Sequence, residues 1–128
     1  MFRRNATITG ALLAVGSIGV LMVMPKPYAR EVLAIVLAGL GGLYAGLGLG
    51  VADRRKFGIQ AAVAVIFGGL SLGGLWLSPR FLALGFLAHA GWDTAHHPSV
   101  LNILVPAWYV PTCLAYDILV GLFVLAWW

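Results

Sequence analysis

Long apolar runs, separated by short stretches of polar residues and proline, occupy most of this chain. Five such runs lie at about 6–24, 31–52, 57–77, 81–96 and 109–127. Because a helix needs about 20 apolar residues to cross a bilayer, the pattern predicts an all-α polytopic membrane helix bundle with about five transmembrane helices, in one membrane domain. Four spans would result if the first run lies outside the bundle or if the short run 81–96 is re-entrant.

The composition supports a membrane protein and excludes a soluble domain. Hydrophobic residues make up 62% of the chain and charged residues only 9%, whereas soluble proteins carry roughly 25% charged residues. Five spans of about 20 residues would use about 100 residues and leave only short loops. The lipid bilayer is therefore the partner that the composition itself predicts.

The positive charges indicate topology and exclude a nucleic-acid partner. The net charge is +4, but the Lys and Arg residues fall in short loops and form no patch. Five of them lie at the N-terminus and in the second loop, and three lie in the first and third loops. Since Lys and Arg are enriched in cytoplasmic loops, we expect a multi-pass protein with its N-terminus inside and its C-terminus outside.

Small residues recur at four-residue spacing in the second and third runs. Such spacing produces a flat helix face against which another backbone can pack closely. We interpret these faces as packing surfaces within the bundle. The alternative is a docking face for another membrane protein subunit or for a second copy of the chain, as in an accessory subunit of a larger complex. The residues are Ala38, Gly42, Gly46 and Gly50, followed by Gly69 and Gly73.

The ionisable residues inside the apolar runs are concentrated near the end of the fourth run. His89, Asp93, His96 and His97 occur there. At about 100° per residue, their angles around a helix are roughly 0°, 40°, 340° and 80°, so all four share one face. Because an unpaired ionisable group inside a membrane costs several kcal/mol, each of these residues is a functional candidate.

The fifth run supplies residues that face this cluster. Cys113 and Asp117 lie one helical turn apart and therefore on one face. The fourth and fifth runs are consecutive and antiparallel. Counting about 1.5 Å per residue from their shared end places Asp93 about 6 Å, Asp117 about 9 Å and His89 about 12 Å inside. We expect these three side chains in one layer of the bilayer, facing one another.

Three imidazoles and two carboxylates, with a thiol nearby, are suitable ligands for a transition metal ion such as zinc, iron, copper or manganese. The single cysteine excludes an internal disulfide. No phosphate-binding loop, nucleophile elbow or Ser/His/Asp triad occurs, so no residue is predicted to be catalytic and enzymatic activity stays open. The expected metal ligands are His89, Asp93, His96 and Asp117, with His97 and Cys113 as secondary candidates.

Three other interpretations fit the same residues. Hydrogen-bonded pairs His89–Asp93 and His96–Asp117 would only stabilise the packing of the last two helices. Two carboxylates at one depth would share a proton, which suits a proton or ion relay. His89 alone, with room left by Gly85 one turn earlier, suits axial ligation of a tetrapyrrole.

A string of polar, aromatic and proline residues extends this pattern along the chain from the start of the second run to the C-terminus. It comprises Arg30, Glu31, Tyr44, Gly46, Asp53, Arg54, His89, Trp92, Asp93, His96, His97, Pro106, Pro111, Cys113 and Asp117. The pattern resembles the small bacterial integral membrane proteins catalogued as domain of unknown function 6010. The resemblance implies a location in the bacterial cytoplasmic membrane and supports the polar cluster as the site, but it selects no chemistry. The first run lies outside it.

Overall fold

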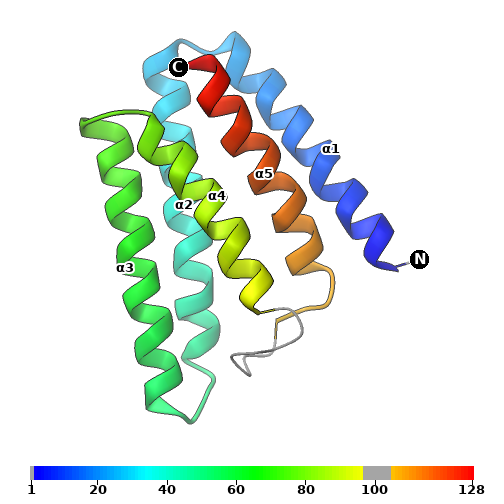
Figure 1. The fold of residues 1–128 in the computed structure, drawn as a ribbon, viewed down its shortest axis with the longest axis vertical. Helices are drawn as coiled ribbons and strands as arrows, with labels where there is room; N and C mark the ends of the chain where they lie inside the picture. Colours follow the sequence, from blue (N-terminus) through cyan, green and yellow to red (C-terminus); the bar gives the residue numbers. More distant parts are fainter. Residues whose placement is uncertain (1, 97–104) are drawn as a thin grey trace.

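The computed structural model describes residues 2–96 and 105–128, and within these residues it contains five α-helices and no strand. Figure 1 shows them crossing back and forth along one axis. This arrangement confirms the predicted all-α bundle. The helices are α1 (Phe2–Val23), α2 (Lys26–Gly48), α3 (Arg54–Trp76), α4 (Arg80–Ala95) and α5 (Tyr109–Trp127).

Four of the helices, α1, α2, α3 and α5, are long and apolar enough to cross a membrane. The fourth helix of the chain, α4, has only 16 residues and is therefore about 24 Å long, less than the roughly 30 Å of a bilayer core. The described residues thus have the character of a multi-pass membrane protein, in which the shorter α4 returns the chain between α3 and α5.

Helix α1 begins at Phe2 rather than near residue 6, and α2 ends at Gly48 rather than near residue 52. Two other boundaries differ from the apolar runs for identifiable reasons. Helix α2 begins at Lys26 rather than near residue 31, because Pro27 lies in its first turn, where a missing N–H costs no helical hydrogen bond. Helix α3 begins at Arg54 rather than near residue 57 because the Asp53 carboxylate caps it. That carboxylate accepts the backbone N–H groups of Arg55 at 2.9 Å and Lys56 at 3.5 Å.

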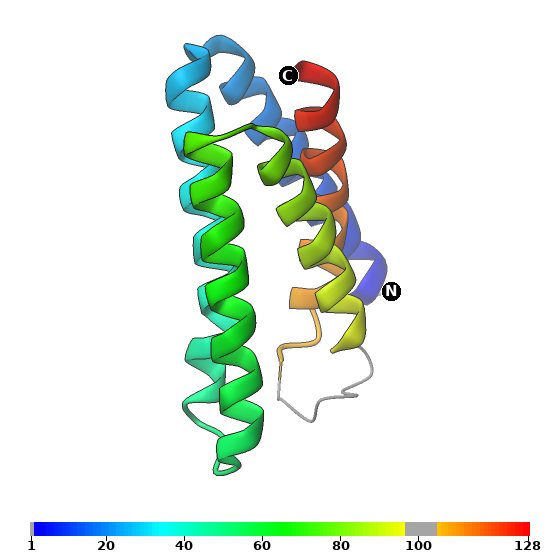
Figure 2. The same ribbon diagram turned by 60° about the vertical axis from the view of Figure 1, so that its left-hand side comes forward.

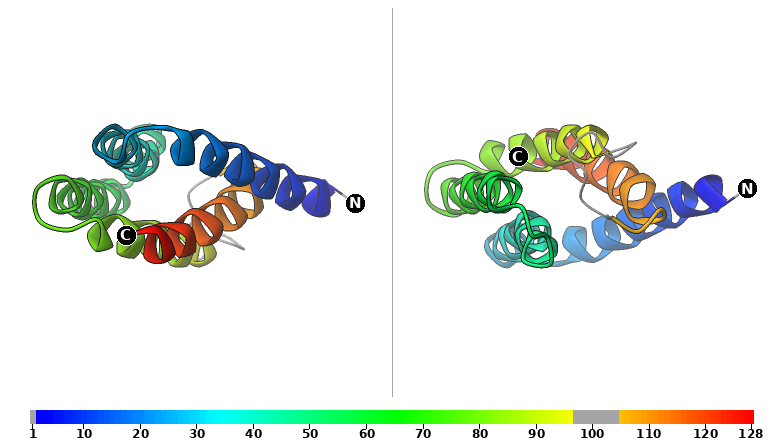
Figure 3. Two further views of the ribbon diagram at one scale, coloured as in Figure 1. Left: turned by 90° about the horizontal axis from the view of Figure 1, so that it is seen from above. Right: turned by 90° about the horizontal axis from the view of Figure 1, so that it is seen from below.

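The bundle has an elongated cross-section, which Figure 3 shows from both ends. Helices α2 and α3 pack together, α4 packs on both α3 and α5, and α1 packs along α5 and contacts α2 only weakly. The α1–α5 contact is close, because a Cβ at Gly10 would overlap the Thr112 carbonyl and Thr112 Oγ1 donates a hydrogen bond to the Ala6 carbonyl at 3.1 Å. Helix α1 is therefore an integral part of the bundle.

The two ends of the bundle differ in what they carry. The C-terminal end bears the α1–α2 turn, the α3–α4 turn and the C-terminus, and the N-terminal end bears the N-terminus and the α2–α3 turn (Figure 1). Figure 2 shows that α2 and α3 extend beyond α4 at the N-terminal end. Toward the C-terminal end the interior is apolar, formed by the buried side chains of Leu33, Leu37, Leu82, Phe86, Val120 and Val124.

Two cations in the first turns of α2 fix the C-terminal end. Lys26 Nζ donates to the backbone carbonyl of Trp127 at 3.0 Å, and Arg30 Nε donates to the carbonyl of Gly74. Carbonyls in the last turn of a helix lack intrahelical partners and attract positive charge. The start of α2 thereby satisfies the ends of both α3 and α5, which joins the three helices at this end.

The small-residue stripe of α2 faces outward, so our interpretation of it as a packing surface within the bundle is wrong. A Cβ added at Gly42 or Gly46 would meet none of the described residues within 4 Å, whereas one at Gly41 would lie 2.5 Å from Phe67 Cβ. Adjacent positions point about 100° apart on a helix, and the buried face of α2 is the one that carries Gly41. The exposed residues of the stripe are Ala38, Gly42, Gly46 and Gly50.

In α3, Gly69 and Gly73 differ: only one of them packs within the bundle, and the other faces outward. A Cβ at Gly69 would meet no described atom within 4 Å, while one at Gly73 would lie 3.2 Å from the Phe81 ring. Packing within the bundle therefore accounts for Gly73 alone.

Candidate metal centre

Three ionisable side chains from α4 and α5 come together inside the bundle. His89 and Asp93 lie one turn apart on α4, and Asp117 faces them from α5. One potential ligand atom from each residue lies within 4.8 Å of the other two. All three residues are 0% exposed. Their shared helix face and depth are the features that the sequence predicts for them.

A short hydrogen bond joins the two helices at this point. His89 Nδ1 lies 2.7 Å from Asp117 Oδ2, and the N–H donates to the carboxylate. The same nitrogen lies 3.7 Å from Asp93 Oδ2. The pairing therefore differs from the hydrogen-bonded pairs considered above, because Asp117 takes His89 as its partner instead of His96.

Helix α2 contributes a third wall through Tyr44. Its hydroxyl donates a hydrogen bond to Asp93 Oδ1 at 2.6 Å, and its side chain is fully buried. From α3, the Phe67 ring packs edge-on against the His89 imidazole, with ring centroids 5.2 Å apart. The group is thus enclosed by four helices and held in position by a phenol and an aromatic ring.

Several polar atoms of the group remain without a hydrogen-bond partner among the described residues. They are His89 Nε2, Asp93 Oδ2 and Asp117 Oδ1. With His89 protonated and both carboxylates ionised, the group carries a net charge of −1. Burying such a charge costs several kcal/mol unless a proton or a cation compensates it. The electrostatics therefore favour a bound positive charge at this position.

One imidazole and two carboxylates form a donor set that suits zinc, iron or manganese. The 2.7 Å separation of His89 Nδ1 and Asp117 Oδ2 is that of two atoms sharing a proton. A metal ion ligated by both atoms would replace this proton. Tyr44 would then orient the Asp93 carboxylate, as outer hydrogen bonds do for ligands in known metal sites.

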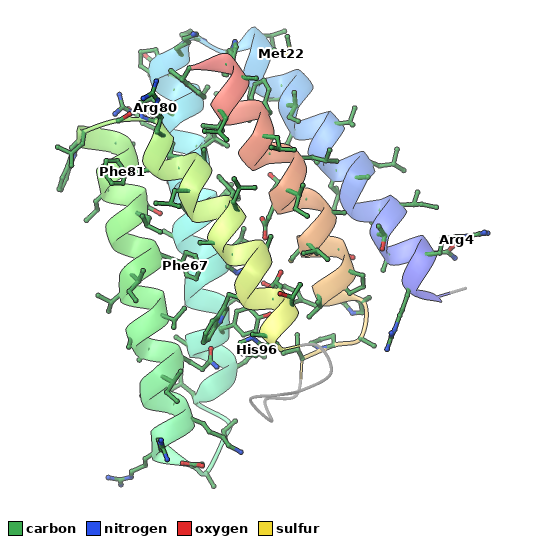
Figure 4. All side chains as sticks on the ribbon, in the orientation of Figure 1. Arg4, Met22, Phe67, Arg80, Phe81 and His96 are labelled. Carbon is green, nitrogen blue, oxygen red and sulfur yellow. The ribbon has the colours of Figure 1, made fainter. Side chains whose placement is uncertain are left out.

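His96 lies next to this group, but it forms hydrogen bonds with other residues. His96 Nδ1 donates to the Trp92 carbonyl at 2.8 Å, so Nε2 accepts a hydrogen bond from the Gln60 amide at 3.0 Å. Figure 4 shows His96 at the end of α4, nearer the N-terminal end than Phe67. Both ring nitrogens are therefore occupied, and His96 is outside the three-residue group.

Of the two secondary candidates, the structure describes only Cys113, and it does not join the group. Cys113 is buried and packs with Tyr44, Tyr109 and Val110, one turn from Asp117 toward the N-terminal end. His97 lies outside the residues that the structure describes. The described geometry thus brings together three of the six predicted ligands: His89, Asp93 and Asp117.

Two residues that contact these side chains were not among the predicted ligands. Tyr44 occurs in the pattern that carries the family resemblance, but the geometric prediction considered only the last two helices. Gln60 is the single amide side chain within the apolar run 57–77, and it is 1% exposed. Its polar side chain inside a membrane run is the signal that could have indicated it.

The tetrapyrrole interpretation needs free space beside Gly85, and the structure fills that space. A Cβ at Gly85 would overlap the Leu37 side chain, and His89 is in contact with Phe67 and Asp117. A flat macrocycle has no room above the imidazole, so this interpretation is wrong.

Comparison with known proteins places the chain in a family. A family model described as "Family of unknown function (DUF6010)" matches residues 5–127. The chain belongs to this family. The match confirms the resemblance inferred from the polar pattern and corrects its extent, because it includes almost all of α1. The comparisons with curated proteins and with solved structures found no match.

Proposed function

We propose that this protein binds a divalent transition metal ion inside the membrane, with His89, Asp93 and Asp117 as ligands. Zinc, iron or manganese suits this donor set, and copper is a further candidate. The main support for this proposal is that three fully buried side chains bring potential ligand atoms within 4.8 Å of one another. The proposal places the chain in the bacterial cytoplasmic membrane with its N-terminus inside.

The composition of the chain strengthens this proposal. It contains four acidic residues, and two of them are buried side by side. One carboxylate is enough to pair with His89, and the second, Asp93, accepts a single hydrogen bond, from Tyr44. The second carboxylate adds a like charge that a metal ion would compensate. The hydrogen bond from Tyr44 accounts for Asp93 Oδ1 but leaves Oδ2 without a partner among the described residues, and a metal ion would use that oxygen.

The test is elemental analysis of detergent-purified protein loaded with each metal in turn and then desalted. Asp93→Asn and Asp117→Asn replace a carboxylate by an amide of the same shape. Glu31→Gln is the matched control, because Glu31 is an exposed carboxylate near the start of α2, beside Leu75 and Trp128 at the C-terminal end. We expect about one metal ion per chain in the wild type and in the control, and loss of the metal in both site variants.

Two outcomes would overturn the proposal. The first is a wild type that retains no metal after loading. The second is metal retained equally by Asp93→Asn and Asp117→Asn, since the ion would then be bound elsewhere. Folding of each variant is checked by gel filtration and circular dichroism, because Asn keeps an acceptor for the Tyr44 hydroxyl and should preserve the helix packing.

A second candidate function is that of an accessory subunit or homo-oligomer that docks through α2. The outward orientation of Gly42 and Gly46, with open space beside each, favours it because small residues allow close approach of another helix. Gly42→Leu should leave the isolated chain folded and abolish any association seen on native gels. Association unaffected by Gly42→Leu and Gly46→Leu would refute this second candidate.

A further inference from the structure

Polar groups around the site are distributed unevenly along the bundle axis. Toward the C-terminal end, one turn from His89 and from Asp117, the site is followed by Phe86 and Val120, both 0% exposed. Toward the N-terminal end the next turns carry polar side chains from three helices. We call these four residues the polar layer: Gln60 of α3, Trp92 at the last turn of α4, His96 at its end, and Tyr109 at the start of α5.

Three residues of the polar layer carry buried polar atoms with no hydrogen-bond partner in the described part of the chain. They are Gln60 Oε1, Trp92 Nε1 and the Tyr109 hydroxyl. Six of the seven such atoms in residues 2–96 and 105–128 belong to the site or the polar layer. Leaving buried donors and acceptors unpaired costs stability, so this concentration requires an explanation other than packing.

The polar layer is continuous with the site. The Tyr44 ring lies 4.3 Å from the His96 ring and 5.8 Å from the Tyr109 ring, centroid to centroid, while its hydroxyl donates to Asp93. The Trp92 and His96 rings are 4.8 Å apart. Tyr44 thus contacts Asp93 of the site as well as His96 and Tyr109 of the polar layer, so the site and the layer are in direct contact through this side chain.

The layer also extends to the end of its helices. Tyr109 is the first residue of α5 and His96 directly follows α4, whereas Asp117 lies about two turns farther inside α5. His96 and Tyr109 are still 4% and 7% exposed, in contrast to the fully buried ligands. The shortest route between the site and an end of the bundle therefore passes through polar groups.

We infer that the metal ion reaches and leaves the site through the polar layer, from the N-terminal end of the bundle. This inference rests on the proposed metal site. A cation that gives up its hydration shell needs oxygen or nitrogen atoms in exchange. Gln60 Oε1 and the Tyr109 hydroxyl, which have no hydrogen-bond partner among the described residues, offer oxygen atoms on this route. On the opposite side the residues next to the site, Phe86 and Val120, are apolar, and the buried Ser71 hydroxyl already donates to the Phe67 carbonyl. Access is therefore one-sided with respect to the membrane.

The single cysteine of the chain is a reporter for this route. Cys113 packs against Tyr109 in the cluster beside the layer and is 8% exposed. The wild-type protein is reconstituted into vesicles and treated with a charged, membrane-impermeant methanethiosulfonate reagent, either outside or trapped inside. Two Cys113→Ser variants define the sides: one also carries Arg55→Cys next to the α2–α3 turn, and the other carries Arg80→Cys at the C-terminal end.

We expect modification of Cys113 only from the side that modifies the Arg55→Cys reporter, and slower modification after the protein is loaded with zinc. Modification only from the side of the Arg80→Cys reporter, or from neither side, would overturn the inference. If zinc does not bind at all, the proposed metal site fails, but the sidedness of Cys113 is still measured. The two failures are thus distinguishable.

A kinetic experiment separates a role in access from a role as ligand. Tyr109→Phe removes only the hydroxyl, and Tyr28→Phe is the matched control because Tyr28 is exposed at the opposite end of the bundle. We expect Tyr109→Phe to slow zinc uptake, measured with a zinc-indicator dye in stopped flow, several-fold without changing the final stoichiometry. Unchanged uptake, or reduced stoichiometry with unchanged uptake, contradicts the role of the layer in access.

Discussion

Replacing Tyr44 by phenylalanine removes one oxygen atom and leaves the ring in place, which makes it a sensitive test of the charge on Asp93. In the structure, the Tyr44 hydroxyl donates to Asp93 Oδ1 at 2.6 Å. The other oxygen, Asp93 Oδ2, has no hydrogen-bond partner among the described residues, and its nearest potential cation, His89 Nδ1, is 3.7 Å away. The variant therefore leaves a fully buried carboxyl group without a hydrogen-bond donor.

The magnitude follows from the kind of hydrogen bond that is lost. A bond to a charged group contributes about 1.5–3 kcal/mol to the free energy of unfolding, and one between neutral groups about 1 kcal/mol. Tyr44→Phe should therefore destabilise the metal-free protein by about 2 kcal/mol in the wild-type background. In the Asp93→Asn background the same change should cost about 1 kcal/mol, which gives a coupling of about 1 kcal/mol.

The assay is reversible unfolding in mixed micelles of mild detergent and sodium dodecyl sulfate, followed by the fluorescence of the five tryptophans. Four proteins complete the double-mutant cycle, and Tyr28→Phe serves as a control for an exposed tyrosine. Bound metal would neutralise Asp93, so saturating metal should stabilise Tyr44→Phe more than it stabilises the wild type. Strict additivity of the two substitutions would refute the reasoning, because the Tyr44 hydrogen bond would then be no stronger to Asp93 than to a neutral amide.

Further predictions concern packing, protons and the polar layer. Gly41→Ala should destabilise the protein by about 1–3 kcal/mol because its Cβ would overlap Phe67. Gly42→Ala should be neutral or stabilising by up to about 1 kcal/mol. Equal effects of the two substitutions in the same unfolding assay would contradict the orientation of α2. Metal affinity should fall as the pH falls, because the metal must displace the proton held at His89. Calorimetry in two buffers of different ionisation enthalpy should show that metal binding releases a proton. Metal binding without proton release would argue against His89 as a ligand. Gln60→Leu should destabilise the protein by about 1–3 kcal/mol, because it leaves His96 Nε2 unpaired. The metal content of this variant, measured by elemental analysis, should stay unchanged. A loss of metal would instead place Gln60 among the ligands.

The helices and the core of the site could be predicted from the sequence because both depend on local periodicity. Apolar runs locate the helices, and the i, i+4 spacing of His89 and Asp93 fixes their common face. The rise per residue along two consecutive antiparallel helices then brings Asp117 to the same depth. These relations need no knowledge of how distant helices pack.

The remaining features depend on packing between helices that are not consecutive or on which face of a helix is buried. Tyr44 reaches Asp93 from α2, and Gln60 reaches His96 from α3, and no spacing in the sequence encodes either contact. Periodicity also could not decide which side of α2 faces the bundle, so the stripe with Gly42 was assigned to the wrong side. The start of α2 was missed because proline ends a helix in its interior but is favourable in its first turn.

The attachment of α2 to the ends of α3 and α5 has a mechanical consequence for the site. Lys26 and Arg30 fix the first turns of α2, while Tyr44 lies about 24 Å farther along the helix axis. A tilt of only about 5° about the fixed end would move Tyr44 by about 2 Å over this lever length. Such a displacement is enough to break its hydrogen bond to Asp93, so the geometry amplifies small rotations of α2 at the metal site while leaving the opposite end unchanged.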